Sequence, residues 1–255
     1  MRFALALTAS LGALTLASGA GGMPAARTLC TGTVTGVVAG DLVVPQGASC
    51  NASGAVVQRR VRIRRDATLT ANGSFSAGRG IDVARGATLE VIGTQISIGG
   101  HVLAQGAKKV ALVREPLVGS NGTVGGSVTI LKTADVSVLS LTIGGKVLVR
   151  GGGGEGVEVG ASRIFKSLEV IRARMLHPQH PRVFSIHSNM VSRHVRVLDN
   201  NATGAISPLF IGGNKLLKGS LTCRRNVPTP VNSGPGGTEP NVVLHGAKRG
   251  QCASL

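Results

Sequence analysis

The sequence lacks the aromatic side chains on which most enzymes and ligand-binding proteins depend. Among its 255 residues there is no tryptophan and no tyrosine, and phenylalanine occurs five times. Tryptophan and tyrosine normally anchor large cores and form platforms against which ligands stack. Their absence argues against an ordinary globular enzyme and against a sugar-binding groove of the usual aromatic kind.

Acidic residues are also scarce. Asp and Glu number 11 against 28 Lys and Arg, which gives a formal net charge of +17. A field of this sign attracts polyanions, which include nucleic acid, acidic polysaccharide, anionic cell-wall polymers and anionic lipid. Because the chain has no stacking platform and no known nucleic-acid reader motif, specific recognition of nucleic acid is not predicted. General solubility charge with loose affinity for polyanions is the simpler interpretation.

The few carboxylates form no recognisable catalytic set. Polysaccharide lyases and hydrolases need clustered carboxylates, as a general acid and base or as Ca²⁺ ligands. Here no Asp-Asp, Asp-x-Asp or Asn-Thr-Asp occurs, and neither a Gly-x-Ser-x-Gly elbow nor a phosphate-binding loop is present. Asp41 and Asp82 share one position of a repeat with Arg62 between them, which predicts a salt-bridged surface ladder rather than an active site.

No metal site or cofactor is predicted. His177, His180, His187 and His194 lie close together in the sequence and could converge on a metal ion. Each of them has Arg or Pro nearby, however, and no carboxylate orients a ring. A cationic loop is therefore the simpler interpretation of this segment.

The first residues predict export. Arg2 precedes an apolar run over 3–16, and Ser18-Gly19-Ala20 resembles a cleavage site. We therefore predict a signal peptide over residues 1–20, with cleavage between 20 and 26. No later stretch reaches the ~18 apolar residues of a transmembrane helix, so no transmembrane segment is predicted. We expect a secreted protein that is extracellular or associated with the cell envelope.

What the sequence does contain is a repeat. Short segments with apolar residues at every second position recur along the chain, centred on Leu42, Val61, Ile81, Val102, Val128 and Val147. A second such segment follows in most units. The alternation predicts strands with one buried face, and their regular recurrence predicts a solenoid. Glycine, at 38 of 255 residues, suits the corners, and the Ile-Gly-Gly triplets at 98–100, 143–145 and 211–213 are interpreted as one repeated corner.

We therefore predict an all-β fold, a single-stranded right-handed parallel β-helix of about eight to nine rungs over residues 27–223. Strands stacked ~4.8 Å apart would make a rod about 40 Å long. The Pro- and Gly-rich residues 224–255 predict an irregular C-terminal cap. We expect a monomer, because disulfide-tied ends argue against stacking into filaments.

The four cysteines lie near the two ends of the chain. An oxidising destination makes disulfides the expected state, and Cys30–Cys50 and Cys223–Cys252 are the favoured pairs among the three pairings that exist. Their spacings correspond to about one turn, and the ends of a solenoid are where its core must be capped. Free buried thiols or a metal site are the alternatives, although no spacing resembles a zinc ligand set.

The densest positive cluster follows the second unit of the repeat. The alternation in Val61-Arg62-Ile63-Arg64 places both arginines on the outer side of one strand. With bases in neighbouring units they predict a strip that contacts an anionic polysaccharide or cell-wall polymer, or that merely discourages edge-to-edge aggregation. The predicted polyanion-binding residues are Arg59, Arg60, Arg62, Arg64, Arg65, Arg79, Arg85, Lys108 and Lys109.

The C-terminal part carries a resemblance to a known group. The segments Asn226-Val227-Pro228-Thr229-Pro230, Asn241-Val242-Val243 and Lys248-Arg249-Gly250-Gln251-Cys252, together with the Gly-Gly-x-Val rungs, resemble exported bacterial parallel β-helix proteins of uncharacterised function. The chain departs from that pattern by extra residues before Cys223. The resemblance implies a fold and an exported location, and it implies no activity.

Two classes of function remain. The first is a non-enzymatic exported protein that binds anionic polymers through a basic face. The alternative is a carbohydrate-active enzyme of the β-helix type, a polysaccharide lyase or hydrolase. Clustered carboxylates in a groove would favour the enzyme, whereas an arginine-lined face without carboxylates would favour the binding protein.

Overall fold

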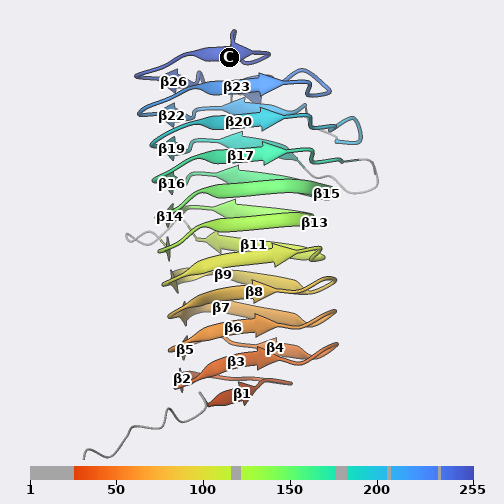
Figure 1. Ribbon diagram of the computed structural model, residues 1–255, viewed down its shortest axis with the longest axis vertical. Helices are drawn as coiled ribbons and strands as arrows, with labels where there is room; N and C mark the ends of the chain where they lie inside the picture. Colours follow the sequence, from red (N-terminus) through yellow and green to blue (C-terminus); the bar gives the residue numbers. More distant parts are fainter. Residues whose placement is uncertain (1–25, 116–121, 176–182, 206–207, 235–236) are drawn as a thin grey trace, which may run out of the picture.

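The computed structural model describes residues 26–115, 122–175, 183–205, 208–234 and 237–255. In this part the chain forms strands and no helix, and 25 strands belong to one continuous sheet whose pairings are parallel. Figure 1 shows these strands stacked along the long axis of the molecule in the order of the sequence. The predicted all-β parallel β-helix is therefore confirmed.

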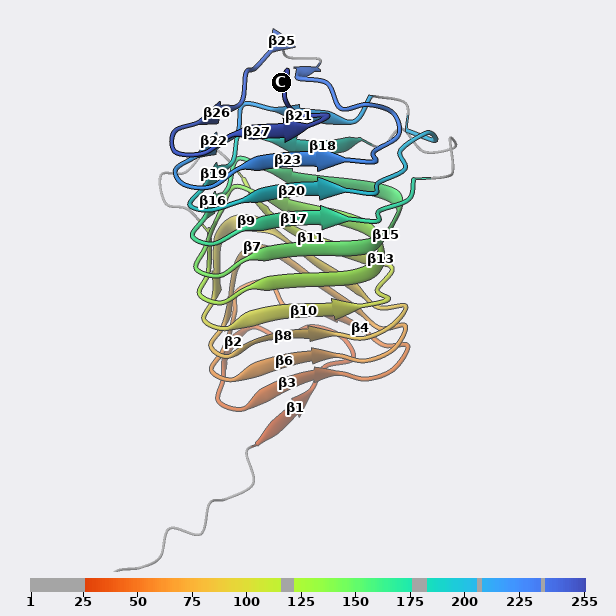
Figure 2. The same cartoon turned by 45° about the horizontal axis from the view of Figure 1, so that its top comes forward.

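Three ladders of parallel strands make up the coil, and we call them faces 1, 2 and 3. Figure 2 shows face 1 as a stack of strands that starts at β1. In spatial order face 1 consists of β1 (Arg27–Leu29), β3 (Asp41–Val44), β6 (Arg60–Ile63), β8 (Gly80–Val83), β10 (His101–Gln105), the first part of β13 (Val128–Leu139), the first part of β15 (Val147–Gly160), β17 (Leu168–Ile171), β20 (Val195–Leu198), β23 (Leu221–Arg224) and β27 (Lys248–Gly250).

Faces 2 and 3 follow face 1 in each turn. Face 2 consists of β4 (Ser49–Asn51), the first parts of β7 (Thr68–Ala77) and β9 (Thr88–Ile98), β11 (Lys109–Arg114), the later parts of β13 and β15, β18 (Phe184–His187) and β21 (Phe210–Gly212). Face 3 consists of β2 (Gly36–Val38), β5 (Ala55–Val57), the later parts of β7 and β9, β12 (Gly122–Val124), β14 (Leu141–Ile143), β16 (Arg163–Ile164), β19 (Met190–Val191), β22 (Lys215–Leu216) and β26 (Val242–Val243).

The coil extends further than the sequence indicated. Face 2 contains eight strands in the described part of the chain, in line with about eight to nine rungs, but face 1 contains eleven. Eleven strands leave ten intervals of ~4.8 Å, so face 1 is about 48 Å long rather than 40 Å. The predicted irregular cap contains β26 and β27, which continue two ladders, and the short antiparallel pair of β24 (Ser233–Gly234) and β25 (Gly237–Thr238).

Aliphatic side chains from face 1 fill one side of the interior. In β6 the pattern is strict, since Val61 and Ile63 point inward while Arg60 and Arg62 point outward. The inward positions pair from turn to turn, and burying each such side chain stabilises the fold by ~1.5–3 kcal/mol. All six of the predicted repeat centres are fully buried, and the stack continues through Leu168, Val195 and Leu221.

Buried side-chain amides, which were not predicted from the sequence, line two corners of the C-terminal turns. At the corner between faces 2 and 3, Nδ2 of Asn189 donates to Oδ1 of Asn214 at 3.0 Å, and Nδ2 of Asn214 donates to Oδ1 of Asn241 at 2.9 Å. At the corner between faces 1 and 2, Asn200, Asn226 and Gln251 form a second ladder of the same kind. Each asparagine oxygen also accepts a backbone N–H of the turn before it, so these ladders satisfy polar groups that the bends would otherwise leave unpaired.

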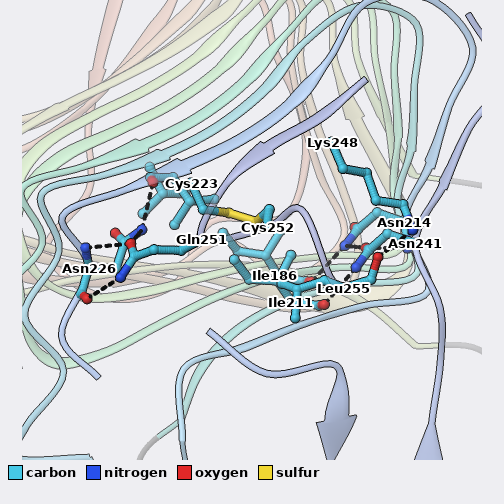
Figure 3. Close-up of a disulfide and its surroundings, with 12 residues drawn as sticks. Ile186, Ile211, Asn214, Cys223, Asn226, Asn241, Lys248, Gln251, Cys252 and Leu255 are labelled. Carbon is cyan, nitrogen blue, oxygen red and sulfur yellow. Dashed lines mark hydrogen bonds between the residues drawn. A yellow bond between two sulfur atoms is a disulfide. The ribbon is translucent and has the colours of Figure 1, made fainter. Parts of the chain in front are cut away.

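Both predicted disulfides are present. Cys30 pairs with Cys50 across a Cα–Cα distance of 5.5 Å, and Cys223 pairs with Cys252 across 5.1 Å. Figure 3 shows the second bond together with Asn226 and Gln251 of one ladder and Asn214 and Asn241 of the other. The two disulfides thus tie the first and last turns of the coil.

Some predictions lie outside the described residues. They are the signal peptide over 1–20 with its cleavage region up to 25, and the two histidines His177 and His180. Among the residues that the structure does describe, none forms a helix long and apolar enough to cross a membrane.

Candidate polyanion-binding site

Ion pairs between arginine and aspartate are present on face 1, but the predicted shared position is wrong. Arg62 lies beside Val43 and Asp82 in register, so Asp41, two residues before Val43, is out of line with them. Nη2 of Arg62 lies 3.4 Å from Oδ2 of Asp41, and Nε of Arg59 lies 3.9 Å from Oδ1 of the same carboxylate. Asp82 pairs with Arg60, at 3.1 Å, rather than with Arg62. Two carboxylates therefore offset much of the charge of the three arginines.

The other predicted bases do not lie on a single strip. Nζ of Lys109 pairs with Oε1 of Glu90 at 3.1 Å on face 2, and Lys108 is exposed just before it. Arg79 lies at the corner between faces 3 and 1, where its N–H donates to the carbonyl of Arg59. Residues that are close in the sequence are separated here because each turn bends onto a new face within a few residues.

A straight line of bases does exist, at the corner between faces 1 and 2. Three of the predicted residues lie there, and four others occupy the corresponding positions in later turns. In register, Leu131 pairs with Arg150, Arg150 with Ile171, and the ladder continues to Arg224. We call this line the basic edge, and its members are Arg64, Arg65, Arg85, Lys132, Arg150, Arg172 and Arg224.

Every member of the basic edge is exposed, and none forms an ion pair with an acid in the described part of the chain. The edge runs from the turn of β6 to the turn of β23, which are seven steps of ~4.8 Å, or about 34 Å in all. Two turns interrupt it: one carries Gln105 and the other carries Leu198 and Asp199. The result is a row of exposed positive charges parallel to the coil axis, with two carboxylates close to it: Asp66 follows Arg65, and Asp199 is near enough to Arg172 for Arg172 to lower its pKa.

Two of these bases are held in a costly backbone conformation. Lys132 has φ of 53° and Arg172 has φ of 57°, while Gly151 takes the same position in the turn between them with φ of 64°. A left-handed conformation costs an L-residue roughly 1–2 kcal/mol, and glycine avoids that cost. The same conformation occurs at Ser140, Ala161 and Ser188 at another corner, so it belongs to the bends of the coil and does not by itself mark a site.

An open hollow of about 960 Å³ adjoins the N-terminal part of the basic edge. Its basic lining comes from Arg62, Arg64, Arg85 and Lys132, and its one acidic lining residue is Asp82. Asp82 is already paired with Arg60. The hollow therefore presents mainly positive charge to a ligand that follows the edge.

At the far end of the edge one acid is neutralised within the protein. The Arg225 guanidinium donates two hydrogen bonds to the carboxylate of Asp199. This contact holds the pKa of Asp199 below its ordinary value, Arg172 lowers that pKa further, and the carboxylate in turn raises the pKa of Arg225. Arg225 is therefore paired with Asp199, whereas Arg172 and Arg224 form no ion pair with a described residue and are exposed to a ligand.

Several of the remaining acids also have partners, whereas Asp66 and Glu115 are exposed and form no ion pair among the described residues. Glu158 lies 3.4 Å from His187 and Glu169 lies 3.9 Å from Arg196, while Asp135 and Glu155 have partners as well. Across the described ranges, no three His, Cys, Asp or Glu side chains are placed to hold a metal ion. His187 is on face 2, whereas His194 is at the corner between faces 3 and 1 and accepts the N–H of Ser220 at 3.1 Å. These two members of the predicted histidine cluster do not converge, and the prediction that no carboxylate orients a ring is wrong for His187, which Glu158 contacts.

Comparisons with protein-family models, with curated proteins and with solved structures found no match.

Proposed function

We propose that the protein is a non-enzymatic exported protein that binds a linear anionic polymer along the basic edge. The observation that carries the proposal is the row of exposed bases, which lies parallel to the coil axis over about 34 Å. An extended polymer with regularly spaced carboxylate, sulfate or phosphate groups has a matching charge pattern.

Affinity in this arrangement comes from many weak contacts. A single exposed ion pair contributes only ~0.2–1 kcal/mol. Seven bases on one rigid scaffold add their contributions because the scaffold already fixes their spacing. Such binding weakens steeply with salt, since each bound base releases a condensed counterion from the polymer.

We further propose an extracellular or cell-envelope location, and membership of the exported bacterial β-helix group that the C-terminal segments resemble. Two disulfides support an oxidising destination. The predicted signal peptide supports export in the same way. In this proposal the protein is a monomer that acts without a cofactor.

The alternative of a carbohydrate-active enzyme has less support. Glycoside hydrolysis needs two carboxyl groups facing one bond. The hollow beside the basic edge offers Asp82 alone, and Arg60 holds that carboxylate. We therefore expect binding without cleavage.

The test measures binding of the exported protein to a polyuronate, a neutral polysaccharide and single-stranded DNA, each at several salt concentrations. Released reducing or unsaturated ends are assayed in the same wells. We compare wild type with a variant carrying Lys132→Gln, Arg150→Gln and Arg172→Gln. The matched control carries Arg79→Gln, Lys146→Gln and Arg249→Gln, which removes three exposed bases elsewhere.

We expect saturable binding to the polyuronate that survives physiological salt. Removal of three edge bases should lower the slope of log K against log salt by about three, whereas the control should lower it far less. An equal loss in both variants would exclude the basic edge as the site. Released ends would overturn the non-enzymatic function. If the protein bound every polyanion and this binding vanished at physiological salt, the net positive charge would give only nonspecific attraction.

A further inference from the structure

The corner between faces 3 and 1 changes its construction along the coil. The first turns carry Ala39-Gly40, Gln58-Arg59 and Gly78-Arg79 there, and the middle turns carry the glycine pairs Gly99-Gly100, Gly125-Gly126 and Gly144-Gly145. A Cβ atom on Gly144 would lie 2.3 Å from the carbonyl oxygen of Gly125, so these glycine turns exclude side chains there. From β16 onward the same positions carry side chains that are large in all but Ser192: Phe165-Lys166, Ser192-Arg193, Leu217-Lys218 and Leu244-His245.

Backbone hydrogen bonds show that these residues are equivalent. The N–H groups of Phe165 and Ser192 donate to the carbonyls of Ile143 and Ile164, one turn below each. Leu217 and Leu244 make the corresponding bonds at 2.9 and 3.0 Å, to Val191 and Leu216. The four residues therefore form one column beside β16, β19, β22 and β26, which Figure 1 shows stacked at one edge of the molecule. Three steps of ~4.8 Å make this column about 15 Å long.

The column and the adjacent outer positions of face 3 form an exposed apolar strip. Phe165 is 47% exposed, Val242 is 44% exposed and Leu244 is 50% exposed, while Met190 and Leu217 are half-buried. Large apolar side chains this accessible are seldom grouped on a soluble surface unless they meet a partner.

Bases lie on both sides of the column. On face 3, Arg163 and Lys215 alternate in register with the apolar Met190 and Val242, so this side of the column is mixed. On the other side lie Lys166, Arg193 and Lys218. We call this surface the amphipathic edge, defined by the apolar residues Phe165, Met190, Leu217, Val242 and Leu244 and the bases Arg163, Lys166, Arg193, Lys215 and Lys218.

The charge of the amphipathic edge is uncompensated. Its five bases are exposed, and none of them is ion-paired with an acid of the described residues. Glu169, the acid that follows in sequence, lies on face 1 and pairs with Arg196. The Arg163 guanidinium lies 5.4 Å from the centre of the Phe165 ring, which places a cation directly beside the exposed aromatic side chain.

We propose that the amphipathic edge docks on the surface of an anionic lipid bilayer. Apolar side chains with bases on both sides are the arrangement by which peripheral proteins lie in a membrane interface. The strip would enter the boundary between headgroups and acyl chains, and Lys and Arg would extend their stems along it to reach the lipid phosphates. Nucleic acid fits less well, because stacking needs several aromatic platforms and the edge has one.

This inference is independent of the polymer-binding function. The basic edge follows face 1 in each turn, whereas the amphipathic edge precedes it, so the two surfaces lie at different corners of the coil. Docking through one corner leaves the other corner open to solvent.

The test is flotation of the exported protein with vesicles at physiological salt. One set of vesicles contains phosphatidylcholine alone, and the other contains phosphatidylcholine with phosphatidylglycerol. The first variant carries Phe165→Ser and Leu244→Ser, with Val56→Ser as a matched control, because Val56 is also on face 3 and is 45% exposed. The second variant carries Lys166→Gln and Lys218→Gln, with Arg174→Gln and Arg249→Gln as its control, because these two exposed bases lie outside both edges. A thermal melt confirms that each variant is folded.

We expect binding to the anionic vesicles and little binding to phosphatidylcholine alone. Each lysine removed from the edge should weaken binding about fivefold, and the two serine substitutions should weaken it at least as much. The control variants should bind nearly as well as wild type. Equal binding of wild type and the two edge variants would overturn the proposal. The proposal would also be overturned if the variant that replaces Phe165 lost binding to single-stranded DNA and kept its binding to the anionic vesicles.

Discussion

The N-terminal and C-terminal turns solve the same structural problem in different ways. In the N-terminal turns one strand meets its counterpart after about 20 residues, as where Leu42 pairs with Val61, and small residues close the corners. In the C-terminal turns the separation is larger, 25 residues between Asn189 and Asn214 and 27 between Asn214 and Asn241. The two parts therefore differ in how backbone groups at the corners are paired: mainly with other backbone groups in the N-terminal turns, and with side-chain amides as well in the C-terminal turns.

The largest effect should come from breaking an amide ladder. Asn214→Ala removes the Oδ1 atom that accepts two hydrogen bonds from Asn189, one from its backbone N–H and one from its Nδ2. Because these donors are buried, we expect the free energy of unfolding in urea to fall by about 3 kcal/mol. Asn72→Ala, at an exposed corner of an N-terminal turn, should change it by less than ~0.5 kcal/mol. Similar losses at both positions would show that the two kinds of turn do not differ in this way.

A smaller effect should come from adding a methyl group to a glycine corner. Gly144→Ala places Cβ 2.3 Å from a backbone oxygen of the neighbouring turn, so the backbone must shift. We expect thermal and urea denaturation to show a loss of about 2 kcal/mol. Gly32→Ala is the control, because a Cβ at Gly32 meets nothing within 4 Å. If Gly144→Ala proved as stable as the control, close stacking of the glycine corners would be wrong.

The smallest effect concerns acid and the Asp199–Arg225 pair. The pKa of Asp199 is lower in the folded protein than in the unfolded chain, where it is ~3.9. Its contribution to stability is therefore fully present above that unfolded value and is lost as the pH falls through the folded pKa. The effect is small because the pair is exposed.

Replacing Asp199 by Asn should flatten the acid limb of the plot of stability against pH. Arg225→Gln should flatten it in the same way, and the double variant should add nothing further. An acid limb that is unchanged by both substitutions would show that other carboxylates govern acid unfolding.

The sequence predicts the interior of this fold better than its corners. The inner stack from Leu42 to Val147 and both disulfides could be predicted, because strands with period two keep a fixed register from turn to turn. The amide ladders could not, since Asn189, Asn214 and Asn241 have no obvious pattern until the longer turns are aligned. Once the turns are aligned, their regular recurrence is the signal.

The surface sites were predicted only in part, for the same reason. Arg64, Arg65 and Arg85 of the basic edge are conspicuous within a basic stretch, but Lys132, Arg150, Arg172 and Arg224 are isolated bases. Their common offset from the face 1 strands is visible only in register.

Identical short sequences can lie at different places in the coil. The Ile-Gly-Gly triplets at 98–100 and 143–145 form the corner between faces 3 and 1. The triplet at 211–213 instead ends β21 on face 2 and leads into the corner between faces 2 and 3, where Asn214 follows. The prediction that all three form one repeated corner was therefore wrong.

The register of face 1 in the N-terminal turns also bears on how the length of such a protein can change. Val61 pairs with Ile81 and Ile81 pairs with Val102. Excision of residues 81–101 would therefore set Val102 directly upon Val61, with every later pairing preserved. The molecule would shorten by one step of ~4.8 Å and keep the same cross-section. A gene for such a chain can lengthen or shorten by whole units, and natural variation in length is expected to come in multiples of a turn.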